Sequence, residues 1–325
     1  MLDTISDEAV SWPRSGPCAA FHIGVGNRMS RLVYGWLTAL VAALPLRLGY
    51  ALAALCGGLH YAAFPARRHA ALANLASILP GSSRRERVRV VKRMMRSYNR
   101  MLFEFFRLPH MERSELLGAV EAVGREHLDG ALAKGRGAIF ASTHIGNWEL
   151  GAVVVAHWGH TIHAVAGVQL NRWLAPAVRD TKTELAIRTV SVEDGFRKLL
   201  RALDRNELVA LMVDGAMYRH GVTVEFFGRE TPFPAGPGVL AHRTGAPIIC
   251  GYCERTGPGR FRIVLEPPID PADHATVEDV NAAVARTVER HIRDHVDQWC
   301  IFRPFWDGPP AEEGSAAASA RRVHA

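Results

Sequence analysis

Short apolar segments alternate with helical patterns through the middle of this chain. Four of these segments, at residues 138–141, 161–168, 187–192 and 208–213, read as buried strands, and helical patterns separate them. Such alternation requires crossover connections, which join parallel strands. We therefore predict an α/β fold with a central, mostly parallel sheet flanked by helices. In folds of this kind ligands bind at the carboxyl ends of the strands.

The first of these strands runs into the most distinctive stretch of the sequence. His144 stands at the strand end, Gly146 and Asn147 form a turn, and Glu149 falls in the first turn of the next helix. Residues five apart on one helix point about 140° away from each other, so His144 and Glu149 can meet only across such a turn. A histidine held by a carboxylate is a general base with a fixed tautomer. The other interpretation is a strand-end histidine bonded to a backbone carbonyl.

Polar and turn-forming residues follow the later strands. Asp214 ends the strand at 208–213, and a run rich in Gly and Pro at 231–238 opens a helix, whose amino terminus is a potential anion site. Asp214 and Arg229 flank a predicted loop at the strand ends, so we place both near the bound substrate. The residues predicted to bind substrate are Asn147, Asp214, Arg229, Gly236 and Gly238.

Residues 32–64 form the most apolar part of the chain, interrupted by Pro45 and Arg47. Each half is shorter than the roughly 20 residues that a spanning helix needs. We consider two membrane arrangements, one tilted and kinked anchor or a helical hairpin that dips into the cytoplasmic leaflet. The alternative is a pair of core helices.

Residues 84–108 predict a long amphipathic helix whose basic side lies opposite an apolar face. The residues predicted to meet lipid headgroups are Arg85, Arg89, Lys92, Arg96 and Arg100. Each such residue near an anionic surface contributes about 1 kcal/mol. The other interpretation is a solvated face of a core helix. The formal net charge of +7 also favours acidic partners, among them an anionic membrane, nucleic acid or an acidic carrier protein.

These segments predict four parts of the chain. They are a flexible tail at 1–28, a hydrophobic membrane anchor at 29–66, a catalytic domain at 67–307 and a disordered tail at 308–325. Met29 directly precedes the apolar region and is a second candidate start of translation. Within the domain, residues 277–299 predict one helix with a core-facing apolar stripe.

Neither cysteines nor histidines predict a metal centre. Five cysteines in 325 residues do not make a disulfide framework. Cys250 and Cys253 lie three apart on a predicted strand, so they face opposite sides of the sheet. The histidines at 157, 160 and 163 straddle a turn. We expect no metal and no bound cofactor.

The segment His144-Ile-Gly-Asn-Trp-Glu149 resembles the His-x4-Asp/Glu signature of glycerolipid acyltransferases. It is most similar to the branch that holds the late acyltransferases of lipid A biosynthesis and the phosphatidylinositol mannoside acyltransferases. Residues 104–109, 226–238 and 297–306 also resemble segments of that branch, and Asp214 matches an acidic position of it. The resemblance extends from about residue 67 to residue 306.

The resemblance implies that His144 deprotonates an acceptor hydroxyl while Glu149 orients the histidine. The hydroxyl then attacks the thioester of an acyl carrier protein or coenzyme A. We expect a membrane-associated O-acyltransferase that acts on a glycolipid or lysophospholipid at the cytoplasmic face of the inner membrane, like the lipid A late acyltransferases. The alternative acceptor is a phosphatidylinositol mannoside. Residues 164–170 lack an arginine found in the lipid A branch, and the closing Phe-Arg-Pro-x-Trp is nearer the mannoside enzymes.

Three other classes of protein fit the sequence less well. A nucleic-acid-binding protein would interleave aromatic and basic residues or carry a docking motif, and the arginine-rich helix does neither. A serine hydrolase of the α/β class would carry Gly-x-Ser-x-Gly, which is absent from the sequence. In a non-catalytic membrane adaptor His144 would be dispensable.

Overall fold

The computed structural model describes residues 25–166, 177, 178, 180, 182, 185, 187–191, 195–215 and 221–306. The predicted tail at 308–325 lies outside the described residues, as does most of residues 173–184, one of the helical patterns between the predicted strands. The predicted tail at 1–28 also lies outside them up to residue 24, and helix α1 begins at Val25 within that range.

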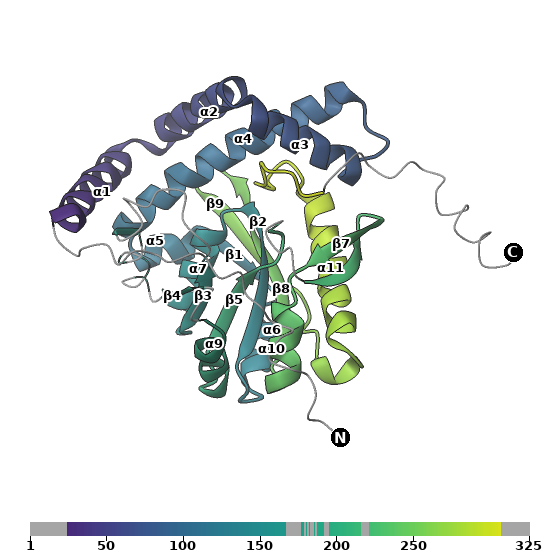
Figure 1. Cartoon of the computed structure of the whole chain (residues 1–325). Helices are drawn as coiled ribbons and strands as arrows, with labels where there is room; N and C mark the ends of the chain where they lie inside the picture. The colour runs from purple at the N-terminus through teal and green to yellow at the C-terminus, as the bar shows by residue number, and fades with distance from the viewer. Residues whose placement is uncertain are drawn as a thin grey trace, which may run out of the picture.

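A seven-stranded sheet forms the centre of the molecule, in the order β1-β9-β8-β2-β5-β3-β4 (Figure 1). Every neighbouring pair is parallel except β8 and β9, which are antiparallel. The predicted mostly parallel sheet is therefore confirmed. The strands are β1 Val120–Val123, β2 Ala138–Gly146, β3 Ile162–Ala166, β4 Ile187–Ser191, β5 Leu208–Met212, β8 Ile248–Gly257 and β9 Arg260–Leu265.

Helices cover both faces of this sheet. On one face pack α9 Gly195–Asp204, α10 Gly236–Thr244 and α11 Val277–Asp294; on the other pack α5 Arg113–Gly118, α6 Arg125–Leu132 and α7 Trp148–His157. The two faces carry separate hydrophobic clusters. Cys250 belongs to the first cluster and Cys253 to the second, so the two thiols lie on opposite faces, as the strand alternation predicts.

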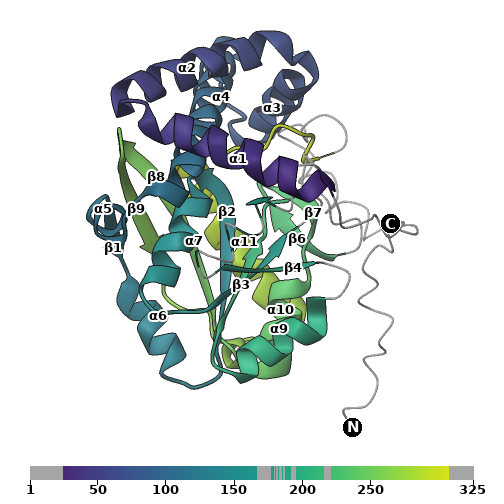
Figure 2. The ribbon, with the colours of Figure 1, turned by 90° about the vertical axis from the view of Figure 1, so that its left-hand side faces the viewer.

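A layer of helices lies across one end of the sheet (Figure 2). Its inner member is α4 Arg84–Arg107, which contacts both β2 and α7. Ser83 and Glu86 form a capping box at the start of α4, and this explains why the helix begins there. The other members are α1 Val25–Ala43, α2 Leu46–Ala63 and α3 Pro65–Ile78, and a separate hairpin, β6 Val222–Phe226 with β7 Arg229–Phe233, packs on α11.

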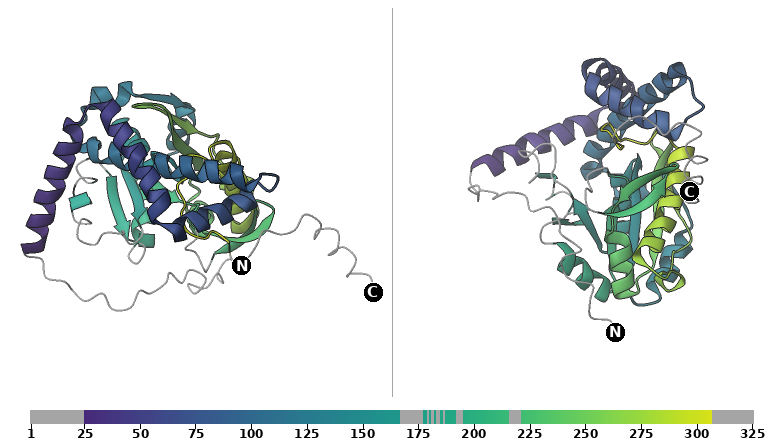
Figure 3. Two further views of the ribbon diagram at one scale, coloured as in Figure 1. Left: turned by 90° about the horizontal axis from the view of Figure 1, so that it is seen from above. Right: turned by 45° about the vertical axis from the view of Figure 1, so that its right-hand side comes forward.

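Helices α1 and α2 meet at a sharp bend on the outer side of this layer (Figure 3). The bend is 116° and falls at Pro45, whose ring cannot continue a helix from the preceding turn. Within the described residues, no single helix has the length and hydropathy of a membrane span, whereas residues 28–43 and 46–63 taken together do, by length and composition.

The inner side of α2 packs closely on α4. A Cβ at Gly49 would lie 1.9 Å from the Phe103 ring, and one at Gly57 would lie 2.6 Å from the Arg96 Cα. Ala53 is buried between these two glycines. Small residues at every fourth position therefore let the two helices approach, and α2 is joined to the catalytic domain along its length.

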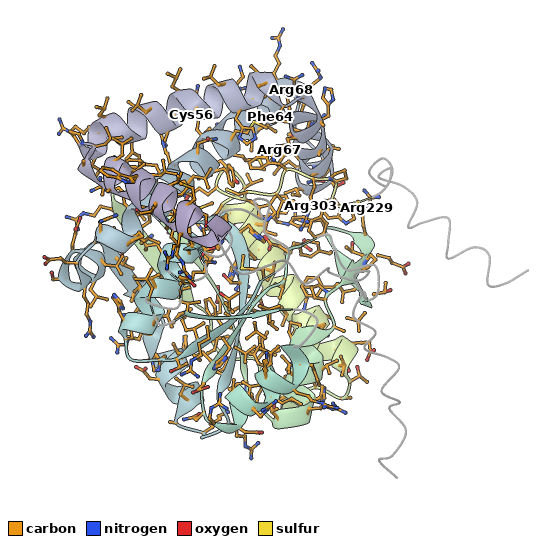
Figure 4. The ribbon with its side chains drawn as sticks, turned by 60° about the vertical axis from the view of Figure 1, so that its left-hand side comes forward. Cys56, Phe64, Arg67, Arg68, Arg229 and Arg303 are labelled. Atoms are coloured by element: carbon orange, nitrogen blue, oxygen red, sulfur yellow. The ribbon has the colours of Figure 1, made fainter. Side chains whose placement is uncertain are left out.

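The outer side of α1 and α2 is apolar and exposed. Nearly all the large hydrophobic side chains that are exposed in the described chain belong to these two helices or to Phe64, the residue that follows α2. Val123 is the exception. The others are Met29, Leu32, Val33, Trp36, Leu40, Leu48, Leu52, Leu55, Leu59 and Phe64. Figure 4 shows Cys56 and Phe64 on this outer layer.

The basic side of α4 is divided between solvent and the interior. Arg85, Arg89, Lys92 and Arg96 are exposed, as the prediction of headgroup contacts requires. Arg100 is half-buried, and its guanidinium lies 5.9 Å from the centre of the Tyr50 ring of α2. This differs from the prediction, because α2 covers the last turns of α4.

Helix α11 ends at Asp294, five residues before the predicted end at 299. Beyond it the chain turns back toward β2, where Trp299 forms an isolated antiparallel bridge with Ile145. The contacts that Trp299 makes at the end of the sheet outweigh the local helical pattern, and they bear directly on His144.

Candidate active site

The register of two parallel strands brings His144 beside Asp214. Strand β2 pairs with β5 so that Ser142 lies opposite Met212, an offset of 70 residues. His144 and Asp214 follow these two positions by the same number of residues. The carboxyl ends of neighbouring parallel strands thus place the two side chains side by side, as expected for a ligand site in an α/β sheet.

Asp214 is fully buried and accepts three hydrogen bonds. Its Oδ1 lies 2.8 Å from Nδ1 of His144, and its Oδ2 accepts from the His144 backbone N–H at 2.7 Å and from the Trp299 indole at 2.8 Å. Burial alone would raise the pKa of the Asp214 carboxyl. The charge and hydrogen bonds of His144, together with the Trp299 indole, outweigh burial and lower that pKa below its ordinary value.

The carboxylate fixes the tautomer of His144. An ionised carboxylate only accepts hydrogen bonds, so Nδ1 carries the proton and Nε2 of the neutral ring presents a lone pair. No described residue hydrogen-bonds Nε2, and the side chain is 25% exposed. Trp148 packs against the ring, with centroids 4.8 Å apart. The geometry is that of a general base directed away from the protein core.

Trp299 is a residue of this site that the sequence pattern missed. Besides its bond to Asp214, the segment around it holds the backbone on both sides of the histidine. The Cys300 N–H donates to the His144 carbonyl at 2.8 Å, and the Gly146 N–H donates to the Gln298 carbonyl at 3.1 Å. The resemblance of residues 297–306 to a family segment was the available signal, but no spacing rule connects Trp299 to Asp214.

Glu149 does not hold His144 in this structure, which differs from the prediction. Its carboxylate instead lies 2.8 Å from Nζ of Lys182, and both side chains are mostly buried. The physical reason is the turn itself, because α7 begins at Trp148 and Asp214 already occupies the Nδ1 side of the ring. The role of Glu149 in catalysis stays a prediction.

Asn147 is fully buried beneath the turn. Its Oδ1 accepts from the Leu150 N–H at 2.9 Å and caps α7, while its Nδ2 donates to Glu104 at 2.9 Å. Asn147 and Asp214 were both predicted to bind substrate, and both lie behind the histidine. Because their side chains are fully buried, they support the site and do not contact a substrate directly.

The three remaining predicted substrate-binding residues lie on the hairpin and α10. Arg229 donates to the Ser77 hydroxyl at 3.1 Å and stacks over Trp306. The Gly238 N–H donates to Asn281, and a Cβ at Gly238 would lie 2.7 Å from the Val277 carbonyl, so this glycine permits close packing of α10 on α11. Gly236 begins α10, and a Cβ there would lie 3.8 Å from the Leu211 side chain of β5.

Within the described part of the chain, no group of three or more His, Cys, Asp or Glu side chains is placed to hold a metal ion. His163, one of the three closely spaced histidines, is buried and bonds Glu207 at 2.7 Å.

Comparison with known proteins identifies the family. Two similar proteins are both named phosphatidylinositol mannoside acyltransferase. The one from Mycobacterium tuberculosis (strain CDC 1551 / Oshkosh) is 31% identical over 233 residues, covering 70% of this chain and 73% of its own length. The one from Mycolicibacterium smegmatis is 29% identical over 232 residues, covering 70% of this chain and 75% of its own length.

A solved structure is also similar, the 1-acyl-sn-glycerophosphate (LPA) acyltransferase, PlsC, from Thermotoga maritima. It is 15% identical with a TM-score of 0.38, covering 75% of this chain and 96% of its own. The sequence profile of the bacterial lipid A biosynthesis acyltransferases matches residues 27–307, which include both the outer helices and the His144 site. The chain therefore belongs to the bacterial lipid A biosynthesis acyltransferase family.

Proposed function

We propose that this protein transfers a fatty acyl chain from an acyl thioester to a hydroxyl of a membrane glycolipid of the phosphatidylinositol mannoside type. One observation carries the chemistry: a histidine at a strand end whose Nδ1 is held by a buried carboxylate and whose Nε2 is open. Membership of the acyltransferase family supplies the reaction class.

The proposed reaction has two steps. Nε2 of His144 takes the proton of the acceptor hydroxyl as its oxygen forms a bond to the thioester carbonyl carbon. The tetrahedral intermediate then expels the thiolate, which recovers the proton from the imidazolium and leaves as the free thiol. Asp214 stabilises the transient positive charge on His144, and Trp299 holds Asp214 in place.

The lysine beside Glu149 supports the same proposal. Lys182 places a cation within 2.8 Å of the Glu149 carboxylate, next to the turn that carries the histidine. We propose that this pair holds the start of α7 and that a further N–H of Lys182 binds a phosphate or carbonyl oxygen of a substrate. Arg229, Gly236 and Gly238 remain proposed contacts of the acceptor or of the donor.

Two features favour a mannoside acceptor over lipid A. The similar proteins in two mycobacterial species are named for phosphatidylinositol mannoside. Residues 164–170 also lack the arginine that the lipid A branch resemblance predicts, and the closing Phe302-Arg303-Pro304-x-Trp306 is of the mannoside kind. A lipid A precursor is the second candidate acceptor, because the family profile carries that description.

We propose that the reaction takes place at a lipid surface, and the outer helices support this. The apolar side of α1 and α2 suits insertion into the outer part of one leaflet, with the exposed basic residues of α4 near anionic headgroups. Acyl carrier protein and coenzyme A thioesters are cytoplasmic, so we propose the cytoplasmic face of the inner membrane. Because hydrophobic insertion does not depend on salt, the full chain should stay with membranes in high salt and should need detergent for release.

A choice of acceptors tests the proposal. The detergent-solubilised full-length protein is given a radiolabelled acyl thioester with mannosylated phosphatidylinositol, a lipid A precursor or lysophosphatidic acid. We expect labelled product with the mannosylated lipid at the highest kcat/KM. Faster transfer to the lipid A precursor would overturn the choice of acceptor, and transfer to none of the three would overturn the function.

A further inference from the structure

A buried cluster of polar side chains connects the outer helix α2 with the catalytic turn. At its centre is Glu104 of α4, which is 4% exposed although it stands in the apolar run of that helix. Its carboxylate accepts from the Tyr50 hydroxyl of α2, from the Arg255 guanidinium of β8 and from the Asn147 amide. A carboxylate this deeply buried is stable only with such donors.

Each donor belongs to a different part of the molecule. The Tyr50 hydroxyl also accepts from the Gly259 N–H at 2.9 Å, at the turn between β8 and β9. Arg255 also donates to Ser97 of α4 at 3.0 Å. Asn147 follows the histidine by three residues and caps α7. Glu104 is thus bonded both to the helix that carries the exposed apolar surface and to the turn that carries His144.

Two of the backbone bonds of that turn lead to the segments next to Arg255. The Asn147 N–H donates to the Cys253 carbonyl at 2.8 Å, and the Gly146 N–H donates to Gln298, whose side chain in turn bonds the Arg255 backbone. A shift of Glu104 or Arg255 therefore moves bonds on both sides of the turn. A shift of α2 reaches them through Tyr50, because the glycine contacts leave no gap between α2 and α4.

We propose that Glu104 is a positioning residue for the His144 turn and that Tyr50 makes this positioning depend on the seating of α2 against a lipid surface. The chemical partner is an anionic bilayer, and the consequence is faster turnover on the membrane than in its absence. This inference rests on the proposed acyl transfer at a lipid surface, and it adds a mechanism by which the surface acts on the catalytic base.

The variant Tyr50→Phe tests the link. It keeps the ring, which packs edge-on against Phe103 at 5.7 Å, and removes only the hydroxyl, so the packing of α2 on α4 is kept. Tyr61→Phe is the matched control, because Tyr61 lies on the same helix and no described residue hydrogen-bonds its hydroxyl. Seating on the bilayer is followed by a fluorophore on Cys56, an exposed thiol of α2, after Cys18→Ser.

Hydrogen exchange of the full-length protein gives a readout that does not require activity. Vesicles of phosphatidylethanolamine and phosphatidylglycerol should slow exchange in peptides covering residues 144–151 of the wild type and of Tyr61→Phe. The factor should be about two- to tenfold, the equivalent of one net hydrogen bond. In Tyr50→Phe the slowing should be lost while the Cys56 signal still reports binding.

Kinetics separate this inference from the proposed function. On vesicles, Tyr50→Phe should lower kcat about two- to tenfold and leave the KM for the thioester unchanged, which a general loss of folding would not do. Equal vesicle responses of exchange in wild type and Tyr50→Phe would overturn the inference even if acyl transfer is normal. A response lost in Tyr50→Phe, in a protein that transfers no acyl group, would overturn the function and the expected gain in turnover, and would leave only the link between α2 and the His144 turn.

Discussion

Replacing Asp214 by asparagine removes one charge and reverses one hydrogen bond at the proposed base. Oδ2 of Asp214 accepts from two donors, the His144 N–H and the Trp299 indole, whereas Oδ1 accepts only from Nδ1 of His144. The single oxygen of asparagine therefore stays on the side with two donors. The amide NH2 then faces Nδ1, which must become the acceptor, and the proton of the neutral ring moves to Nε2.

The expected loss follows from this change of tautomer. A histidine protonated on Nε2 cannot accept the proton of a hydroxyl there. Loss of a general base costs about 10²–10⁴-fold, and the same acid-to-amide change in a Ser-His-Asp triad costs about 10⁴-fold. We therefore expect kcat of Asp214→Asn to fall by about 10²–10⁴-fold, or about 3–5 kcal/mol of activation free energy. The KM for the thioester should change little.

Glu207→Gln is a matched control for this experiment. It makes the same change of carboxylate to amide beside another buried histidine, His163, away from the proposed site. Its kcat should stay within a few-fold of wild type. In Asp214→Asn, ¹⁵N spectra of the histidine rings should show an exchanged tautomer for His144 and for no other histidine. A folded Asp214→Asn protein with kcat within tenfold of wild type would refute the reasoning.

Three further predictions concern the site and the fold. Glu149→Ala should severely depress transfer, and Lys182→Ala should share part of that loss because the two side chains form one ion pair; steady-state kinetics of both variants check this. Gly49→Ala should lower the free energy of unfolding by about 1–3 kcal/mol, because the added methyl group overlaps the Phe103 ring of α4. Gly58→Ala is the control, because the space at its Cβ is open, and thermal unfolding of both variants checks the prediction. The lowered pKa of Asp214 contributes stability above its unfolded value of about 3.9, and this stability is lost as pH falls through the folded pKa; urea unfolding between about pH 2.5 and 5 should be less pH-dependent in Asp214→Asn.

Most of the sheet could be predicted from the sequence, because strand and helix periods differ and the crossovers dictate parallel pairing. The predicted strand at 138–141 is the start of β2, and the other predicted strands correspond to observed ones within a few residues. Opposite faces for Cys250 and Cys253 followed from the same alternation. These features depend on local pattern, which a single sequence contains.

The partner of His144 could not be predicted in this way. The spacing pointed to Glu149, five residues away, whereas the structure uses Asp214, 70 residues away, and Trp299 beyond it. Knowing that β2 pairs with β5 in that register would have found Asp214, but no local signal reveals a register between strands. Trp299 was further hidden by a helical pattern that continues past Asp294.

The outer helices show the same limit. Their composition predicted membrane attachment, but it did not reveal that Gly49 and Gly57 seat α2 on α4 as part of the domain. The basic face of α4 predicts that a chain starting near Arg67 still binds anionic vesicles but releases with salt. The structure adds that such a truncation would uncover the Phe103 side of α4, so substitutions on the exposed face are the cleaner test.

The central claim is that Nε2 of His144 takes the proton of an acceptor hydroxyl. Single-turnover transfer from an acyl thioester to mannosylated phosphatidylinositol, by wild type and by folded His144→Ala, tests it most directly. We predict that the rate of the first turnover falls by about 10²–10⁴-fold in His144→Ala while thioester binding is kept. A first turnover in His144→Ala near the wild-type rate would contradict the claim.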